Sequence, residues 1–491
     1  MDPAATNVRD RATERRQRWL LIAVAAGVFV AADDQTSIVT VLPSMISDVG
    51  LTVDDLYQAS WIVNGYLLGY IVALPIVGRI ADVYGHARVY AAALVLFMLG
   101  SLLVAIAPGF EAIVLSRALQ AVGGGAVVPV AMAIVVDELP RDRRLLGLGA
   151  IAAASEAGAL IGPLWGGAIT EWFGWRTVFW INIPMSLPVL VAVWRLAGTS
   201  RRQAGIDWIG AALLGAALAV LTVALVDDPN ESRPLQDTIG MLVLAAALAL
   251  LFWRHELRTT TPLVRPGMLR AGPVIAANLT SLLLGGGLIT VLIGVPLFVN
   301  LVLAESALDG GLTLMRLTVA VPIGALAGGW LGSRLGLRLV AAAGMALAAV
   351  GFVGLQTWGE APSQLLRTVP LLIGGFGFGL VIAPLSAAVL QRVGEDERAT
   401  AASWLTLSRV TGMLVGAALL TSSGLGRFYA RAGTIDIDSP GFDALVLEAE
   451  VSTFREVFIA AAVMMVVATL IAWWIGRGDR DGIDEPWWTI T

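Results

Sequence analysis

Apolar stretches bounded by charged residues, glycine or proline recur along almost the whole chain. A helix of about 20 apolar residues spans the hydrocarbon core of a bilayer, so each stretch predicts a transmembrane helix. The fourteen predicted helices cover residues 19–43, 57–78, 88–107, 110–136, 145–170, 176–196, 206–226, 237–253, 273–303, 308–332, 337–358, 367–391, 399–430 and 452–476. An even number of crossings puts both chain ends on the same side of the membrane.

The composition agrees with an all-α membrane protein that crosses the bilayer many times. Only 14% of the 491 residues are charged, whereas a soluble domain carries about 25%. The chain has no cysteine, and its two histidines, His86 and His255, fall in short polar segments. We therefore expect no disulfide, no metal or other cofactor, and no nucleic-acid partner. An enzyme is not expected either, because no histidine–acid pair at catalytic spacing lies within the apolar stretches.

Arginine is unevenly distributed between alternate loops. Most of the 32 basic residues, all arginine, fall in segments that face the cytoplasm if the N-terminus does. The first loop on the opposite side instead holds Asp48, Asp54 and Asp55. The positive-inside rule then places both termini in the cytoplasm.

Two short segments suggest an internal repeat. Residues 78–88 read GRIADVYGHAR and residues 329–338 read GWLGSRLGLR, with glycines at matching positions. In the first copy these are Gly78 and Gly85, followed by Arg88, and Asp82 lies between them. The glycines allow two helices to meet across a tight turn, and Asp82 can meet arginines and the positive end of an opposite helix.

A repeat of this kind predicts two pseudo-symmetric six-helix halves separated by two extra helices, a 6+2+6 order typical of transporters with parallel repeats. The predicted parts are a basic cytoplasmic head (1–18), the first half (19–197), two linker helices (198–258), the second half (259–477) with a projecting periplasmic hairpin near 425–451, and a cytoplasmic tail (478–491).

Further motifs carry a resemblance to a known family. Arg117 and Gln120 lie in RALQAVG of the fourth predicted helix, and a glycine motif follows in the fifth. The motif of the fifth helix contains Gly158, Gly162, Pro163 and Gly166. Together with the 78–88 segment, they resemble the major facilitator superfamily, in its fourteen-helix branch of proton-coupled exporters. The resemblance implies the major facilitator fold and secondary active transport.

A narrower similarity suggests the substrate. Residues 61–70, 379–386, 409–416 and 424–428 resemble the mycobacterial triacylglyceride exporters of the inner membrane. This similarity implies export of a lipid, namely triacylglyceride, by a monomer in the bacterial inner membrane, with membrane lipids and a periplasmic lipid-carrying lipoprotein as partners. The alternative within the same branch is a proton-coupled multidrug efflux antiporter.

Five ionisable residues fall deep inside predicted helices: Asp33, Asp34, Arg117, Glu156 and Arg409. Each costs about 2.5 to 3.5 kcal/mol near the middle of a bilayer, which favours pairing or a role in the transport pathway. Asp34 and Arg409 lie at similar depth, so Arg409 is expected to pair with Asp34 first and with Glu156 second. In the resembling exporters, the residues that match Asp34, Glu156 and Arg409 act in proton coupling or as ion locks. Asp33 is an additional acid, and which acid titrates stays open.

The glycines of the fifth helix, and the last two helices, can each be interpreted in more than one way. Gly158, Gly162 and Gly166 with Pro163 suit either close packing or a kinked helix that rocks during transport. The last two helices are each about 34 residues long, or about 50 Å, against a core of about 30 Å. They either project as a hairpin, or tilt, or end in an acidic loop. Arg316 has no assigned role.

Overall fold

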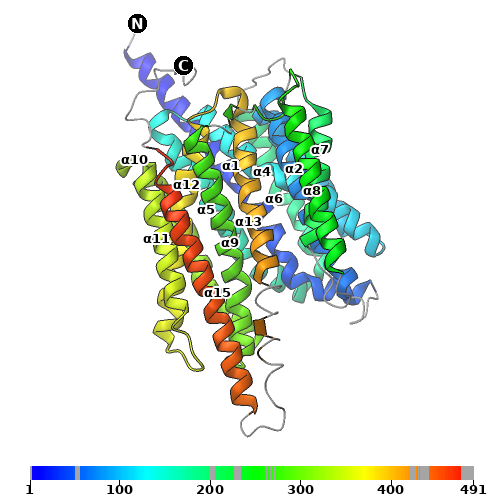
Figure 1. Ribbon diagram of the computed structural model, residues 1–491. Coiled ribbons are helices and arrows are strands. Elements are labelled where there is room, and N and C mark those ends of the chain that lie inside the picture. Colours follow the sequence, from blue (N-terminus) through cyan, green and yellow to red (C-terminus); the bar gives the residue numbers. More distant parts are fainter. Residues whose placement is uncertain are drawn as a thin grey trace. The chain divides into compact units, whose positions relative to one another are not determined.

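The fold comes from a computed structural model, which describes residues 3–49, 56–197, 205–225, 234–260, 262–265, 267–268, 271–420, 427–428, 431 and 442–476. Within these residues all regular structure is helical (Figure 1). The helices are α1 (Pro3–Asp48), α2 (Leu56–Tyr84), α3 (His86–Ala105), α4 (Phe110–Glu138), α5 (Arg141–Phe173), α6 (Trp175–Leu196), α7 (Trp208–Leu225), α8 (Leu235–Glu256), α9 (Gly272–Leu301), α10 (Ala307–Leu335), α11 (Leu337–Leu355), α12 (Gln364–Leu390), the 3-10 helix η3 (Glu395–Glu397), α13 (Arg398–Leu419) and α15 (Phe442–Ala472).

Fourteen of these helices are long and apolar enough to cross a membrane, which confirms the predicted number and the all-α fold class. α1 begins at Pro3, so the described part of the basic head continues into the first membrane helix without a break. α13 ends at Leu419, and most of the predicted hairpin lies outside the described residues. The tail 478–491 also lies outside them. The grouping of the helices as 6+2+6 stays a prediction.

The chain forms two compact units. Unit 1 contains residues 1–268 and 393–410, and unit 2 contains residues 269–392 and 411–491. The helix α13 therefore starts in unit 1 and ends in unit 2. This division reflects the contacts that residues at the beginning of α13 make with helices of the first part of the chain.

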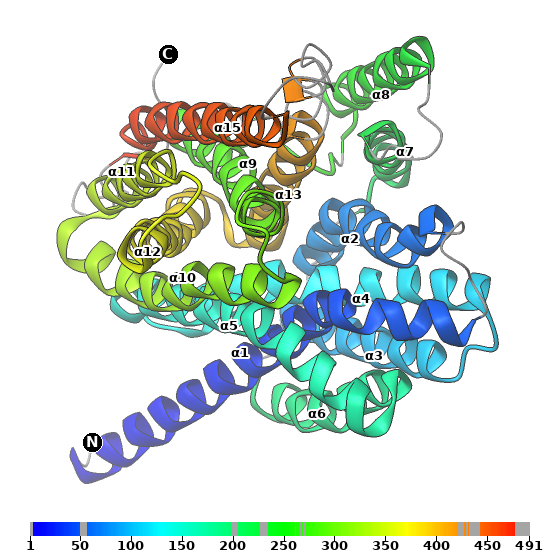
Figure 2. The ribbon, with the colours of Figure 1, turned by 90° about the horizontal axis from the view of Figure 1, so that it is seen from below.

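In unit 1, α1 packs against α5 and α6, and α4 packs against α2 and α3. The most apolar part of α4 is 89% buried, whereas that of α8 is 11% buried. α4 is therefore an inner helix, and α8 presents most of its surface outward. Figure 2 shows α7 and α8 side by side, with α7 next to α2.

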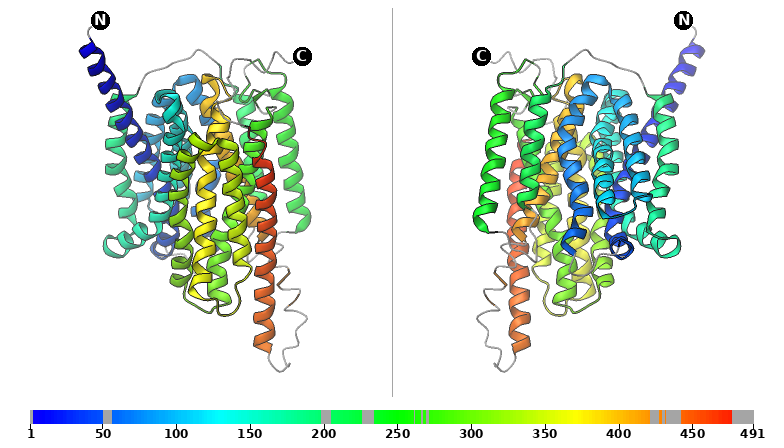
Figure 3. Two further views of the ribbon diagram at one scale, coloured as in Figure 1. Left: turned by 90° about the vertical axis from the view of Figure 1, so that its left-hand side faces the viewer. Right: turned by 90° about the vertical axis from the view of Figure 1, so that its right-hand side faces the viewer.

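In unit 2, α12 packs between α10 and α11, and α15 packs on α11 and α9. Aromatic rings fill the contact between these helices, with Phe298 of α9 edge-on to both Trp358 and Phe454. Figures 1 and 3 show α15, in orange and red, running past the ends of α11 and α12.

Single glycines with positive φ form three of the helix junctions. Gly85 (φ 98°) joins α2 to α3, and Gly336 (φ 91°) joins α10 to α11. These are the matching glycines of the two repeat segments. Side chains other than glycine rarely adopt this backbone conformation, so the same local requirement explains the residue in both copies. Gly174 (φ 83°) joins α5 to α6 in the same way.

Candidate functional site

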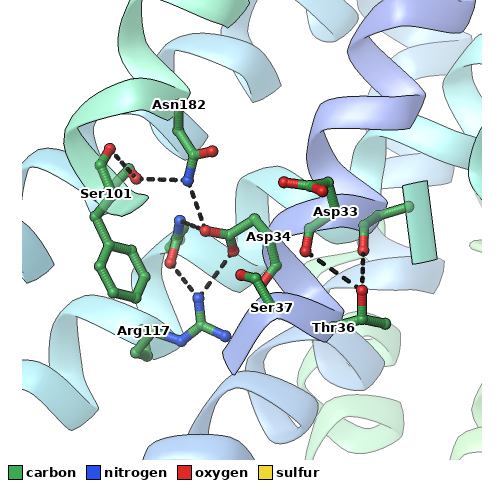
Figure 4. Close-up of polar contacts among 10 residues, drawn as sticks. Asp33, Asp34, Thr36, Ser37, Ser101, Arg117 and Asn182 are labelled. Atoms are coloured by element: carbon green, nitrogen blue, oxygen red, sulfur yellow. Dashed lines mark hydrogen bonds and ion pairs between the residues drawn. The ribbon is translucent and has the colours of Figure 1, made fainter. Parts of the chain in front are cut away.

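A cluster of polar side chains surrounds Asp34 in the interior of unit 1 (Figure 4). Asp34 lies in α1 and is 0% exposed. Arg117 of α4 donates from Nη1 to Asp34 Oδ2 at 2.8 Å, and Gln120 donates from Nε2 to Oδ1 at 2.9 Å. Asn182 of α6 donates from Nδ2 to the same Oδ1 at 2.6 Å. The carboxylate therefore has one cationic partner and two neutral donors.

Arg117 has favourable contacts beyond the carboxylate. Its Nη1 also donates to Gln120 Oε1 at 2.8 Å. The centre of its guanidinium lies 4.3 Å from the ring centroid of Tyr66 and 5.5 Å from that of Phe179. A cation above an aromatic face is stabilised by the ring's quadrupole, most strongly when desolvated. The motif residues Arg117 and Gln120 thus belong to this group of polar side chains, which we call the Asp34 cluster below.

The sequence analysis missed Asn182 as a member of this cluster. Asn182 lies within an apolar run, and its Nδ2 also donates to Ser101 Oγ of α3 at 3.0 Å. Ser101 in turn donates to the carbonyl oxygen of Phe179 at 2.9 Å. A buried amide needs partners, and an asparagine in a membrane helix was the available signal. The cluster links α1, α3, α4 and α6.

The expected pair of Asp34 with Arg409 is not formed. Arg409 Nη1 lies 3.3 Å from Glu156 Oε1 of α5, which was the second choice. The side chains are 18% and 17% exposed, so this pair is far more accessible than the Asp34 cluster. Depth along a helix does not give the direction around the helix axis, in which Asp34 turns toward α4 and α6.

Asp33 differs from its neighbour. It is 3% exposed, and its Oδ1 atom has no hydrogen-bond partner within the described residues. No dashed line reaches its carboxylate in Figure 4; Thr36 Oγ1 donates to the backbone carbonyl oxygen of Asp33 at 3.3 Å. The carboxylate of Asp34 is therefore hydrogen-bonded, whereas Oδ1 of Asp33 has no partner within the described residues.

Close packing of α1 on α5 depends on the glycines of the fifth helix. A Cβ atom at Gly162 would lie 2.6 Å from the carbonyl oxygen of Asp33, and one at Gly166 would lie 2.9 Å from that of Ser37. At Gly158 it would lie 3.0 Å from the backbone nitrogen of Asp33. Pro163 lies inside α5, and its carbonyl oxygen accepts a hydrogen bond from Thr40 Oγ1 at 3.0 Å. These residues bring the two backbones together at the level of Asp33.

Asp82, at the end of α2, caps the beginning of α13. Its Oδ1 accepts from the backbone nitrogen of Ala399 at 2.8 Å. Its Oδ2 accepts from the backbone nitrogen and Oγ1 of Thr400 at 2.8 and 2.6 Å. An anion at a helix N-terminus meets unpaired N–H groups and the positive end of the helix dipole. A Cβ atom at Gly78 would lie 2.9 Å from the carbonyl oxygen of Ala399, so this glycine allows the close approach.

His86 extends this contact to α4. Its Nε2 lies 2.9 Å from Asp82 Oδ1, and its Nδ1 lies 2.6 Å from Asp137 Oδ2. Arg398 of α13 pairs with the other oxygen of Asp137. Ionised carboxylates only accept hydrogen bonds, so a ring bonded to both must carry protons on both nitrogens. We call the group of Asp82, His86, Asp137 and Arg398 the α13 latch. The sequence analysis placed His86 in a short polar segment and missed its contacts with the two acids. Arg88 is exposed.

Other arginines have partners in unit 2. Arg316 of α10 donates to Thr368 Oγ1 at 2.9 Å and to Gln364 Oε1 at 3.2 Å, so it links α10 to α12. Arg431 forms an ion pair with Glu456 of α15, and Arg427 Nη1 lies 3.0 Å from the same carboxylate. Within the described residues, no group of three or more histidine, aspartate or glutamate side chains could hold a metal ion.

Comparisons with known proteins fit these features. Residues 24–417 match the family model of the Major Facilitator Superfamily. The triacylglyceride transporter of Mycolicibacterium smegmatis is 34% identical, over 92% of this chain and 86% of the relative. The triacylglyceride transporter of Mycobacterium tuberculosis is 32% identical, over 95% and 96%.

A solved structure supports the same fold. A proton:xylose symporter of this superfamily, bound to 6-bromo-6-deoxy-D-glucose, superposes with a TM-score of 0.64 at 13% sequence identity. The match covers 95% of this chain and 97% of that chain. With the fourteen membrane-spanning helices and the family match over most of its length, the chain belongs to the major facilitator superfamily of membrane transporters.

Proposed function

We propose that this transporter exports a lipid, triacylglyceride, from the bacterial inner membrane by alternating access coupled to protons, with both termini in the cytoplasm. The observation that carries the substrate is the similarity, along nearly the whole chain, to relatives named triacylglyceride transporters. The transporter works as a monomer among membrane lipids in this proposal.

The Glu156–Arg409 pair is suited to act as an ion lock. Its 3.3 Å separation and partial exposure make it weaker than the fully buried Asp34–Arg117 pair. Protonation of Glu156 removes the attraction between the two side chains, which releases Arg409 and with it α13. Asp34, paired with Arg117, forms a second lock that holds α1 against α4 and α6.

The α13 latch provides a gate at the opposite end of α13. Asp82 holds the first turn of this helix through two backbone N–H groups, and Gly78 allows the approach. Gly85 fixes the turn that directs α2 into α3. Opening on this side requires the N-terminus of α13 to leave Asp82, so we assign Gly78, Asp82, Gly85 and Arg88 to gating.

The length of α15 favours a lipid as the substrate. Its 31 residues correspond to about 46 Å, against a hydrocarbon core of about 30 Å. About 15 Å therefore extends beyond the core. The pairs of Arg427 and Arg431 with Glu456 hold the returning segment against α15. We propose that this periplasmic hairpin, near residues 425–451, passes lipid to a lipid-carrying lipoprotein.

A transport assay tests the proposal. The purified protein is reconstituted in vesicles with a fluorescent triacylglyceride, and transfer to an external acceptor is followed with and without an imposed pH gradient. We expect transfer that the gradient accelerates, and loss of transfer in Glu156→Gln. Arg176→Gln, which removes an exposed pair with Asp48, is the matched control and should transfer normally. Proton-linked movement of cationic drugs without lipid transfer would replace this function with multidrug antiport.

The hairpin has its own test. Removing about two turns around residues 427–432 together with 444–450 should impair lipid transfer while membrane insertion is kept. A variant in which the same residues are replaced by a glycine–serine segment of equal length controls for the change in chain length. Unchanged transfer after the deletion would contradict a role of the hairpin in lipid export.

A further inference from the structure

An apolar groove lies on unit 2, where α10 and α11 both pack on α12 (Figure 2). The groove has a volume of about 310 Å³ and is lined by Ala320, Ile323, Leu347, Leu372, Ile373 and Phe376. Ile323 is 58% exposed and Leu372 is 41% exposed, so the groove opens at the surface of these helices. Because all three helices are long and apolar enough to span the membrane, the groove suits a hydrocarbon chain rather than a polar ligand.

The face of α10 that borders the groove continues to an arginine at the end of this helix. Trp330 and Arg334 follow Ile323 by seven and eleven residues, so all three lie on one face of α10. The centre of the Arg334 guanidinium lies 4.2 Å from the ring centroid of Trp330, which is 47% exposed. Along the helix axis, Ile323 and Arg334 are about 16 Å apart, close to half of a hydrocarbon core of about 30 Å. A lipid of one leaflet can therefore place its headgroup at Arg334 and the end of a chain in the groove.

The charge of this end of unit 2 favours an anion. Within the described residues, neither Arg334 nor Arg338 forms an ion pair with an acid, whereas the exposed Arg265 of unit 1 pairs with Asp396. Arg338 instead lies with its guanidinium centre 3.7 Å from the ring centroid of Trp473, and its Nε has no hydrogen-bond partner in this part of the chain. A guanidinium donates two parallel hydrogen bonds to a phosphate. The two arginines therefore provide a positive charge that a phosphate can neutralise.

Two simpler roles explain only part of this arrangement. A cation in the last turn of a helix is favourable with the helix dipole, which applies to Arg334. An exposed tryptophan at the end of a membrane helix anchors at the level of the headgroups, which applies to Trp330. Neither role requires an apolar groove on the same face of α10, one leaflet away from the arginine.

We propose that the face of α10 from Ile323 to Arg334 binds an anionic phospholipid, with the phosphate on Arg334 and one acyl chain in the groove. The indole of Trp330 holds the guanidinium at the level of the headgroup. All of these residues belong to unit 2, whereas the Asp34 cluster belongs to unit 1. Triacylglyceride has no phosphate and lacks the group that Arg334 recognises. The bound phospholipid is thus a membrane-lipid partner and not the transported substrate, and the inference does not depend on the proposed function.

Native mass spectrometry of the purified protein tests the headgroup contact. The protein is mixed with phosphatidylglycerol or with phosphatidylcholine of the same acyl chains and is then released from detergent micelles. The wild type should retain phosphatidylglycerol about 5-fold better, and Arg334→Gln should lose this preference, because one arginine near a membrane surface contributes about 1 kcal/mol to the binding of an anionic lipid. Arg265→Gln is the matched control, since Arg265 is 55% exposed and paired with Asp396 and Glu397, and it should keep the preference. No preference in the wild type, an unchanged preference in Arg334→Gln, or an equal loss in both variants would overturn the proposal.

A second pair of variants tests the groove. Ile323→Trp places a larger ring in the space of the acyl chain and should lose the retained phosphatidylglycerol. Val463→Trp changes a position of α15 that is also 58% exposed, and it should retain the lipid. Because both positions are exposed, both variants should unfold at the temperature of the wild type, which checks that a lost lipid does not reflect a lost fold. Retention of phosphatidylglycerol by Ile323→Trp at the level of the wild type would contradict the placement of the chain in the groove.

Discussion

The Asp34 cluster leads to a quantitative prediction about Arg117. Both side chains of the Asp34–Arg117 pair are 0% exposed, and the donor–acceptor distance is 2.8 Å. Arg117→Met keeps the length of the side chain but leaves the carboxylate with only the neutral donors Gln120 and Asn182. Removing one partner of a buried ion pair costs about 3–5 kcal/mol, since the remaining charge is uncompensated. We expect the free energy of unfolding to fall by about that amount.

The reciprocal change should cost less. In Asp34→Asn, the guanidinium of Arg117 keeps its bond to Gln120 Oε1 and its position 4.3 Å from the ring centroid of Tyr66. A desolvated cation–π contact is worth about 2 kcal/mol, which offsets part of the loss. The double variant has neither charge, so it should be more stable than Arg117→Met alone. The coupling energy of the cycle should reach about 2–3 kcal/mol, the upper range for groups in contact.

The measurement is unfolding of the purified protein in mixed micelles by titration with dodecyl sulfate, followed by far-UV circular dichroism. The control is Arg176→Gln, because the Arg176–Asp48 pair is 39% and 42% exposed. Such surface pairs contribute about 0–1 kcal/mol. If the changes at Arg117 and Asp34 add within about 0.5 kcal/mol, or if Arg117→Met costs no more than Arg176→Gln, the cluster does not compensate charge as described.

Three further experiments test the lock, the latch and the helix contact. Glu156→Gln and Arg409→Gln should show a coupling energy of about 1 kcal/mol on the equilibrium between access states, measured by cysteine labelling of engineered sites, and strict additivity would separate their roles. Thr400→Val removes the 2.6 Å bond to Asp82 and should weaken the latch by about 1.5–3 kcal/mol, seen as more labelling of sites beside the latch. Unchanged labelling would rule out a closing role for this bond. Gly162→Val should lower the free energy of unfolding by about 1–3 kcal/mol or more, because its side chain meets the α1 backbone, whereas Gly240→Val, with open space around it, should not.

The membrane helices could be predicted from the sequence because their cause is local. An apolar run of sufficient length can only be satisfied as a helix in a bilayer, so fourteen runs gave fourteen helices. The turns at Gly85 and Gly336 were detectable for a similar reason, since a positive φ favours glycine whatever the rest of the chain does. Helix ends were less certain: the predicted break before residue 88 falls in the structure between Tyr84 and His86.

The partners of the buried charges could not be predicted in the same way. Residue counting placed Asp34, Arg117, Glu156 and Arg409 at mid-depth, but the choice among pairs depends on how each helix is rotated against its neighbours. His86 shows the same limit. Its contact with Asp82 crosses the turn at Gly85, and its contact with Asp137 comes from a helix about fifty residues further along the chain. The sequence offered only a histidine near an acid.

Asp33 and Asp34 show which physical criterion separates two adjacent acids. Successive residues of a helix point about 100° apart, so the pair cannot share one environment. Arg117, Gln120 and Asn182 all donate to Asp34, whereas Oδ1 of the buried Asp33 has no hydrogen-bond partner within the described residues. A buried acid with a cation beside it stabilises the fold as a carboxylate, and a buried acid without one is stable only with a proton. The availability of a cation, rather than depth in the membrane, therefore distinguishes the surroundings of Asp34 from those of Asp33.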